Sequence, residues 1–354
     1  MKNIQSKIAL LAVLAGSVTA QAQVQVVFTG STAFRSVDED RAAALFDAGF
    51  TTAGDGSANN YRTYNGTITS LFGSQTVTIY MSFSGSGSGM EAVLNGTQVQ
   101  CYPVGGSSPS LSLTPDCAFS DIFPEGDNLA SAAFDDVSTL GVIPFVFAAS
   151  ASSQLAGITN LTRDQAVLLM TDSGSTPAYF FGGSNTNINN KVYLVGRDSG
   201  SGTRITTFDD IGFFGTPNQW VNIGGVIQAD PTGGQSSGSG VRNTLATNTS
   251  FIGYLGVADY NTVAATVNKL AYNGTPFNIT NVENGSYGIW GYEHFVSRFG
   301  LSSGQKNLRA ALITAITDSG YQSTNANYAG LFAPLSGMHV QRFSDGGPIT
   351  SIDF

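Results

Sequence analysis

Short apolar runs alternate with stretches of helical periodicity along this chain of 354 residues. The apolar runs predict strands at residues 24–28, 77–83, 142–147, 192–195 and 251–257. The pattern at residues 38–46 predicts a helix, and Ser303 predicts the N-cap of a second helix that runs to Thr317. Alternation of strands and helices is typical of an α/β fold. Ser- and Gly-rich stretches predict loops at residues 84–89, 105–110 and 233–240.

Three of the predicted strands end in a turn of Gly, Ser and Thr that opens a helix. These turns lie at residues 30–32, 85–87 and 200–203. Ser and Thr are ordinary N-caps, so one such turn by itself predicts only a cap. Three turns at the carboxyl ends of strands predict a shared crevice, because open α/β sheets bind ligands there. Helix N-termini carry unpaired N–H groups, and these groups favour an anion.

Charge and composition argue against several classes of function. Charged residues make up only 11% of the chain and the formal net charge is −9, which argues against nucleic acid as a partner. Two Cys and two His exclude a multi-Cys zinc site, and no metal or cofactor is expected. The sequence contains no phosphate-binding P-loop, no His-Glu-x-x-His and no Gly-x-Ser-x-Gly motif. We therefore expect a binding protein and not an enzyme.

The N-terminus has the pattern of a signal peptide. Lys2 and Lys7 precede a short apolar run at residues 8–18, and Ala20 and Ala22 are the small residues of a cleavage site. Cleavage after Ala22 predicts a periplasmic or extracellular protein. In an oxidising compartment Cys101 and Cys117 are expected to form a disulfide, and two independent thiols are the alternative.

Several segments, taken in order, resemble the phosphate-binding protein family of ABC importers, a branch of the type II periplasmic binding proteins. The strongest match is Arg-Asp-Ser-Gly-Ser-Gly-Thr at residues 197–203, which resembles the family's Arg-x-x-Gly-Ser-Gly-Thr. The other matching segments are residues 30–34, 84–92, 118–121, 240–254 and 287–295. The order of the segments over most of the chain carries more weight than any one of them.

The resemblance implies a two-lobed α/β fold with a ligand cleft between the lobes. It implies that lobe one takes residues 23–146 plus 258–354 and lobe two residues 147–257. Carried over residue by residue, it implies an anion-binding shell of Thr32, Ala33, Ser86, Asp121, Arg197, Ser201, Gly202 and Thr203. Arg197 offers a planar fork of donors that suits a tetrahedral oxyanion. Asp121 favours phosphate over sulfate, because hydrogen phosphate has a proton to donate to a carboxylate.

The expected protein is a monomer that captures inorganic phosphate and delivers it to the membrane component of an ABC importer. Two alternatives stay open at this point: a binder of another oxyanion, and an extracellular structural or adhesive protein that keeps the fold without transport. Arg35 and Arg204 flank the turns and either add positive potential or lie solvated on the surface. His294, among aromatic residues, is expected to be a packed core histidine.

Overall fold

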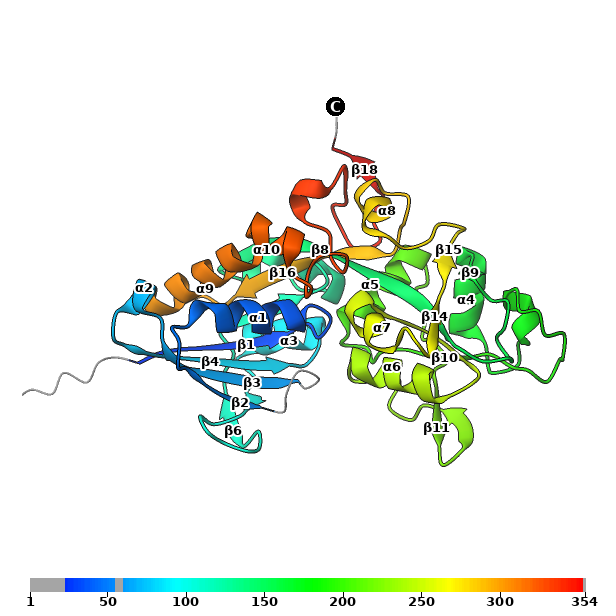
Figure 1. The fold of residues 1–354 in the computed structure, drawn as a ribbon, viewed down its shortest axis with the longest axis horizontal. Helices are drawn as coiled ribbons and strands as arrows, with labels where there is room; N and C mark the ends of the chain where they lie inside the picture. Colours follow the sequence, from blue (N-terminus) through cyan, green and yellow to red (C-terminus); the bar gives the residue numbers. More distant parts are fainter. Residues whose placement is uncertain (1–22, 55–59, 353–354) are drawn as a thin grey trace, which may run out of the picture.

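A large mixed sheet organises the molecule. The computed structural model describes residues 23–54 and 60–352, so the predicted signal peptide lies outside the described residues. Within them, ten strands form one sheet, in the order β10-β13-β8-β16-β7-β1-β4-β3-β2, with β14 paired to β8. The two ends of this sheet lie in two lobes, which are seen side by side in Figure 1.

The first lobe is built on a central parallel pair of strands. Val24 to Gly30 of β1 pair in parallel with β4, and β1 also pairs in parallel with β7. The strands of this lobe are β1 (Val24–Gly30), β2 (Thr51–Gly54), β3 (Tyr61–Thr67), β4 (Thr76–Phe83), β7 (Cys117–Ser120) and β16 (Trp290–Ser297). Its helices are α1 (Arg35–Leu45), α2 (Thr69–Phe72), α3 (Ser86–Asn95), α9 (Ser303–Ile316) and α10 (Ser319–Thr324). The buried, apolar β1 and β4 are the strands that the sequence pattern predicts.

The second lobe is reached through one long strand. β8 (Asp136–Ser150) pairs with β16 over residues 136–144 and with β13 over residues 145–149. The other strands of this part of the sheet are β10 (Tyr193–Val195), β13 (Phe251–Gly256) and β14 (Val267–Lys269). Its helices are α4 (Arg163–Thr171), α5 (Gly202–Ile211), α6 (Gly238–Thr247) and α7 (Val257–Val263). β8 therefore connects the cores of both lobes.

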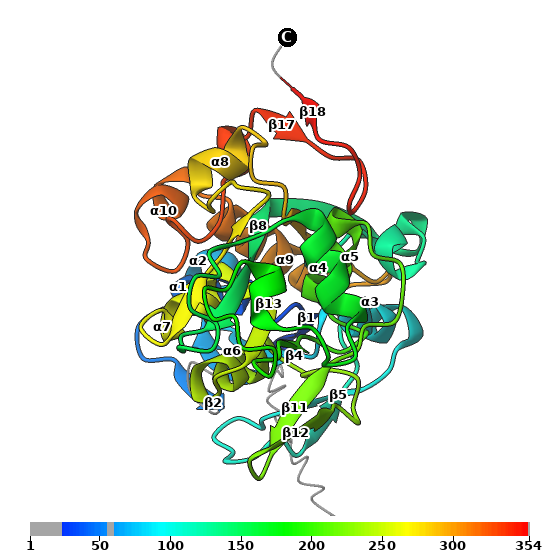
Figure 2. The same cartoon turned by 90° about the vertical axis from the view of Figure 1, so that its right-hand side faces the viewer.

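Short elements complete the fold. The remaining strands form two-stranded pairs: β5 (Val99–Cys101) with β6 (Leu111–Leu113), β9 (Asn160–Leu161) with β15 (Ala271–Tyr272), β11 (Trp220–Ile223) with β12 (Val226–Ala229), and β17 (Val340–Gln341) with β18 (Thr350–Ser351). The β11–β12 hairpin projects from lobe two, at the bottom of Figure 1 and of Figure 2. The remaining helical segments are α8 (Ile279–Glu283), η1 (Pro124–Asp127), η2 (Ser131–Ala133), η3 (Ala178–Phe181) and η4 (Leu335–Gly337).

The strand pairing shifts the expected lobe boundary. α7 packs on α6, β8 and β13, and β14 and β15 pair with β8 and β9. Residues 258–272, expected in lobe one, thus pack with elements of lobe two. We propose that lobe two runs from about residue 145 to about residue 272. The chain continues beyond the end of β13 to pair with strands of lobe two, and it returns to lobe one only after β15.

Three local expectations need correction. Helix α3 begins at Ser86, so residues 86–89 of the segment 84–89, expected as a loop, are helical. Helix α6 begins at Gly238, inside another segment expected as a loop. The N-cap of α9 is Ser302 and not Ser303, because its hydroxyl accepts from the Gln305 N–H while the Gln305 side chain accepts from the Ser302 N–H.

The predicted disulfide is wrong, because both cysteines are free and buried. Cys117 is paired in register with Phe28 of β1, whereas Cys101 packs with Val27 and Tyr80. Since neighbouring residues of a strand point to opposite faces, the two thiols lie on opposite sides of the sheet. Burial raises the pKa of the Cys101 thiol to about 12, so this thiol is also unreactive.

Candidate functional site

The three Gly/Ser/Thr turns meet where the lobes face each other. The turn after β4 touches the turn that opens α5, since the Gly87 N–H donates to the Gly200 carbonyl at 3.2 Å. Gly85, at φ +109°, lies where an added Cβ would be 2.9 Å from the Gly200 oxygen. Only glycine accepts this conformation and this close approach without strain. The turn after β1 joins them through Thr32, which contacts Arg197.

Arg197 is the central cation of the site. Its side chain is 1% exposed, and its Nη1 donates to the Thr32 hydroxyl at 3.2 Å across the two lobes. Nε and Nη2 donate to the carbonyls of Gln235 and Ser236 at 3.0 and 3.1 Å. The backbone N–H of Arg197 donates to the Tyr254 hydroxyl at 3.1 Å. These contacts fix the guanidinium plane against the first turn, which is the orientation that recognition of an oxyanion requires.

Asp121 lies on the other side of the same turns. Its carboxylate accepts from the Ser31 hydroxyl through one oxygen and from the Thr203 hydroxyl, at 3.2 Å, through the other. Its backbone N–H donates to the Ser86 hydroxyl at 3.0 Å. Burial raises the pKa of the Asp121 carboxyl, while the hydrogen bond from Ser31 and the positive charge of Arg197 act in the opposite direction. Asp121 is therefore a buried acceptor and not an exposed loop residue.

The N-terminus of α5 completes the cluster. Ser201 is the N-cap and accepts from the Arg204 N–H at 3.4 Å, and Gly202 is the first helical residue. An added Cβ on Gly202 would lie 2.8 Å from the Cβ of Asp121 and from the Cβ of Ser86. This closeness brings the segments 84–92, 118–121 and 197–203 into contact. A side chain at residue 202 would push the two lobes apart.

All eight residues predicted for the anion shell are buried and gathered at the interface of the lobes. Ala33, whose N–H was expected to face the ligand, donates that N–H to the Ser31 hydroxyl at 3.2 Å. The helices that start here differ in their caps: α1 and α3 have no side-chain cap at their N-termini, whereas α5 is capped by Ser201. The N-termini of α1 and α3 thus keep their positive ends without a protein side chain bound to them.

A cavity of about 250 Å³ lies along the seam between the lobes and reaches Thr32 and Ala33. Arg35 from α1 and Arg242 from α6 line it, and Arg242 forms an ion pair with Asp259 of α7 at 2.9 Å. Arg35 is buried and donates to the Asn60 side chain at 2.8 Å, so it is not a solvated surface residue. Arg204 donates to the carbonyls of Arg197 and Gly233, both at 3.2 Å.

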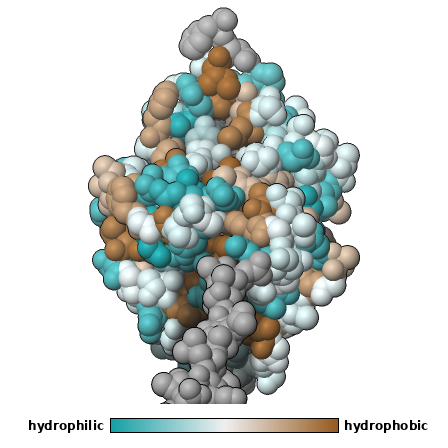
Figure 3. Space-filling view, turned by 90° about the vertical axis from the view of Figure 1, so that its left-hand side faces the viewer, coloured by the Kyte–Doolittle hydropathy of each residue, from teal (hydrophilic) through white to brown (hydrophobic). Residues whose placement is uncertain are grey.

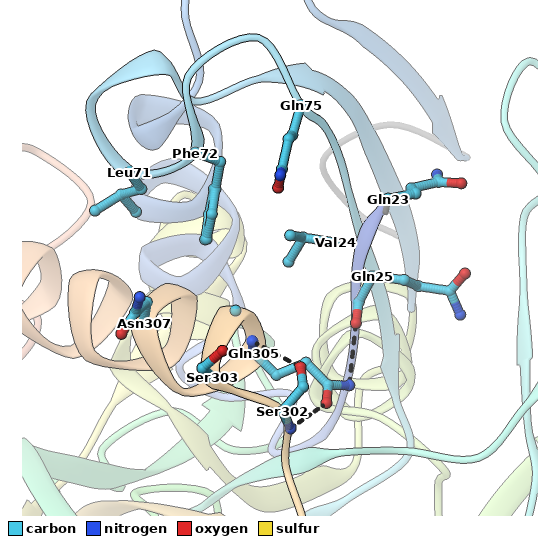
Figure 4. Close-up of a pocket in the computed structure, with 11 residues that line it drawn as sticks. Gln23, Val24, Gln25, Leu71, Phe72, Gln75, Ser302, Ser303, Gln305 and Asn307 are labelled. Carbon is cyan, nitrogen blue, oxygen red and sulfur yellow. Dashed lines mark hydrogen bonds between the residues drawn. The ribbon is translucent and has the colours of Figure 1, made fainter. Parts of the chain in front are cut away.

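A larger cavity than the one at the seam lies elsewhere. A pocket of about 700 Å³ opens at the outer end of lobe one, between the start of β1, α2 and the start of α9. Gln23, Gln25, Gln75, Gln305 and Asn307 supply its polar lining, and Figure 4 shows their side chains around Val24 and Phe72. Hydrophilic and hydrophobic residues are interspersed over this end of the molecule in Figure 3. None of the predicted site residues lines this pocket.

Sequence reasoning missed four groups at the interface. Ser31 bonds Asp121, Tyr254 bonds the Arg197 backbone, and Asp38 and Glu293 are buried carboxyls beside Asp121. Ser31 lies within the first turn and could have been read from that motif. Tyr254 and Glu293 lie in two of the segments that carry the resemblance, 240–254 and 287–295, but the resemblance gave them no role. Asp38 lies in the predicted helix, and no local pattern marks it as part of the site. His294 is buried against the Phe123 ring, at 4.4 Å between ring centroids, as the sequence predicted for a core histidine.

Two further features bear on the class of protein. Among residues 23–54 and 60–352, no cluster of His, Cys, Asp and Glu is arranged to hold a metal ion. No helix in the same ranges has the length and apolar content to span a membrane. The two-lobed α/β fold, which the sequence resemblance implied, matches that of solved periplasmic phosphate-binding proteins.

Comparison with solved structures supports this fold. The chain is similar to a protein from Clostridium perfringens described as a phosphate ABC transporter substrate-binding protein with bound phosphate, with a TM-score of 0.57, 17% identity, and coverage of 88% of this chain and 99% of that one. It is also similar to a high-affinity periplasmic phosphate-binding protein bound with phosphate, with a TM-score of 0.50, 15% identity, and coverage of 88% and 91%.

A third similar structure is a phosphate-binding protein from Stenotrophomonas maltophilia, with a TM-score of 0.50, 15% identity, and coverage of 83% of this chain and 84% of that one. No family model matches the chain, and no curated protein sequence matches it. The likeness is therefore one of fold, and the function has to be argued from the site.

Proposed function

We propose that this protein is an exported, monomeric solute-binding protein. It captures inorganic phosphate between its lobes and delivers it to the membrane component of an ABC importer, in the periplasm or outside the cell. The observation that carries the proposal is the meeting of a buried Arg197 with Asp121 and three helix-opening turns at the lobe interface. Solved neighbours with bound phosphate support the same ligand class.

The chemistry of the cluster fits a tetrahedral oxyanion. Arg197 supplies a cation, and the hydroxyls of Thr32 and Ser86 supply donors, because their oxygens accept in the bonds from Arg197 and Asp121. The starts of α1 and α3, which have no side-chain cap, supply positive helix ends. Binding requires the direct bond between Arg197 and Thr32 to be exchanged for bonds to the ligand. Both groups are already desolvated, so the site is preorganised for such an exchange.

Asp121 decides between phosphate and sulfate. A buried carboxylate accepts a hydrogen bond from the O–H of hydrogen phosphate, whereas fully ionised sulfate has no proton to donate and places a like charge beside it. Hydrogen phosphate and hydrogen arsenate each carry such a proton. The arrangement therefore favours those two anions and penalises sulfate.

Calorimetry of the purified mature protein with phosphate, arsenate and sulfate tests the proposal. Phosphate and arsenate are expected to bind at one site per chain, with sulfate weaker. Preference for sulfate would assign the site to another oxyanion. Absence of binding for all three anions would contradict a transport role and favour a structural or adhesive protein that keeps the fold.

A further inference from the structure

Three carboxyl groups are buried together behind the anion site. Asp38 of α1, Asp121 after β7 and Glu293 of β16 are 0%, 2% and 0% exposed. The charges of Asp38 and Asp121 both act on Glu293, so the three groups form one electrostatic cluster. Burial of like charges at this density is costly unless protons neutralise part of it.

The strand pairing explains how Glu293 comes to face Asp121. β16 runs antiparallel to β7 with His294 opposite Ser120, which places residue 293 beside residue 121. On its other side β16 has a β-bulge between Glu293 and His294, where Glu293 pairs with Gly141 of β8. A bulge redirects a side chain from its regular position in the sheet. Glu293 is therefore held at the inner edge of the site by the pairing of three strands.

The donors in this cluster are unevenly distributed. Asp121 accepts from two hydroxyls, those of Ser31 and Thr203, and lies near Arg197. No well-formed hydrogen bond from a protein donor among the described residues reaches either oxygen of Glu293 or of Asp38. Glu293 and Asp121 are close enough for their side chains to act on each other, and two carboxyls can share a hydrogen bond only if one of them carries a proton.

The proton belongs on Glu293. Asp121 has the donors and the nearby cation that stabilise a negative charge, whereas Glu293 has neither. Burial, followed by the charges of Asp121 and Asp38, raises the pKa of Glu293 well above its ordinary value. A carboxylate has about four acceptor positions. Ser31 and Thr203 fill two of them on Asp121, and a bond from a protonated Glu293 would fill a third, which leaves one for a ligand hydroxyl.

We propose that Glu293 is a specificity-determining residue of the interlobe site. Its protonated carboxyl donates to Asp121 and keeps Asp121 ionised, so that Asp121 accepts from a protonated oxyanion and rejects an unprotonated one. This inference rests on the proposed function. The proton stays on Glu293 throughout, and no proton transfer to the ligand is required.

The same arrangement makes anion affinity depend on pH. The charged or titratable groups around Glu293 are Asp121 from β7, Asp38 from α1 and Tyr328 from the segment after α10, with Arg197 and Arg35 further along the cluster. When Glu293 loses its proton at high pH, a second negative charge appears behind Asp121. Anion affinity then falls, beyond the change caused by the ionisation of phosphate itself.

Two variants of Glu293 separate hydrogen bonding from packing. Glu293→Gln keeps a donor for Asp121 and cannot ionise, whereas Glu293→Leu keeps the volume and removes the donor. By calorimetry at about pH 7, Glu293→Gln is expected to retain the phosphate-to-sulfate affinity ratio within roughly threefold. Glu293→Leu is expected to lower that ratio by roughly tenfold or more. Glu91→Gln, on the exposed face of α3, is the control for the change in net charge.

If the phosphate-to-sulfate affinity ratio is the same in the wild type and both variants, or falls equally in both variants, the role of Glu293 is overturned. Phosphate binding itself would remain in place. Failure of the wild type to bind phosphate would instead contradict the proposed function. If Glu293→Leu does not fold, the pH profile decides. Between about pH 8 and pH 10, phosphate affinity is expected to fall more steeply in the wild type than in Glu293→Gln, and parallel profiles would contradict the proposal.

Infrared spectroscopy of the ligand-free protein gives a readout that needs no anion. A protonated carboxyl has a C=O stretch that is resolved from that of a carboxylate. The wild type at about pH 7 is expected to show such a band, with a component that is lost in Glu293→Gln and kept in Glu91→Gln. An unchanged band in Glu293→Gln would show that Glu293 is ionised and would overturn the proposal.

Discussion

The interlobe site and the large pocket at the outer end of lobe one both lie at a helix N-terminus, but they differ in volume and charge. Each contains a helix N-terminus capped by a serine, Ser201 of α5 and Ser302 of α9. The outer pocket is the larger, at about 700 Å³ against about 250 Å³ for the interlobe cavity. Its lining residues are all uncharged, whereas the interlobe region holds Arg197 and Asp121.

The helix N-caps explain why the volume of a cavity is a poor guide to the site of anion binding. At α9, Ser302 and Gln305 form a capping box, so protein groups satisfy the helix start from both directions. At the lobe interface, α1 and α3 start without a side-chain cap, beside a buried cation. An anion gains free energy from donors and charges that the protein has not already paired. The comparison therefore favours the lobe interface over the larger outer pocket as the proposed anion site.

Removal of Arg197 should produce the largest effect. Arg197→Ala is expected to weaken phosphate binding by about 2–5 kcal/mol, because a buried charge-assisted contact is lost. Gln75→Ala in the outer pocket should leave the affinity unchanged. Calorimetry of both variants, with thermal unfolding as a check of folding, measures the difference. Unchanged phosphate affinity in Arg197→Ala would rule out the interlobe site.

Asp121→Asn should change selectivity more than affinity. The Asn oxygen still accepts a hydrogen bond while its NH₂ group can donate, so sulfate loses its penalty. The preference for phosphate over sulfate is expected to fall by about 1–3 kcal/mol. Asp164→Asn, at an exposed position of α4, provides the matched control. Paired titrations that give identical phosphate-to-sulfate ratios would show that Asp121 does not face the ligand.

One glycine substitution made in each region sharpens the contrast between them. In Gly202→Ala the new Cβ meets the Cβ atoms of Asp121 and Ser86 at 2.8 Å, and about 1–3 kcal/mol of unfolding free energy should be lost together with phosphate affinity. In Gly304→Ala the nearest atom is a methyl of Val24 at 3.2 Å, which can move. Urea denaturation should show a smaller effect there, because alanine also favours the helix. Equal losses of unfolding free energy in Gly202→Ala and Gly304→Ala would contradict the proposed difference between the two regions.

The helix caps should give the smallest effect. Ser302→Ala removes the capping box of α9 and is expected to cost about 1 kcal/mol of unfolding free energy without altering phosphate affinity. Ser201→Ala should cost a similar amount of stability and weaken phosphate binding as well, since α5 starts at the site. Denaturation and calorimetry on both variants separate the two outcomes. A loss of phosphate affinity in Ser302→Ala would indicate that the outer pocket contributes to binding.

The chain sequence by itself determined the strands that build the two cores and the turns that meet at the site. The apolar runs at β1, β4, β10 and β13 and the turns after β1, β4 and β10 are local patterns. Parallel pairing brings the ends of β1 and β4 together in lobe one, and the third turn reaches them because the lobes face each other. Arg197, Ser201 and Thr203 could therefore be predicted from one short motif. Asp121 needed the family resemblance, because a single aspartate in a loop has no distinctive pattern.

The tertiary structure alone decided which distant residues share an environment. The register of β7 against β1 places Cys117 on the face opposite to Cys101, and so two cysteines close in the sequence stay apart. The pairing of β14 and β15 with β8 and β9 supports the proposed extension of lobe two beyond the end of β13. A β-bulge and an antiparallel register bring Glu293 to Asp121 across nearly half of the chain. Such pairings depend on strand order and side-chain burial, which arise only when the sheet is assembled.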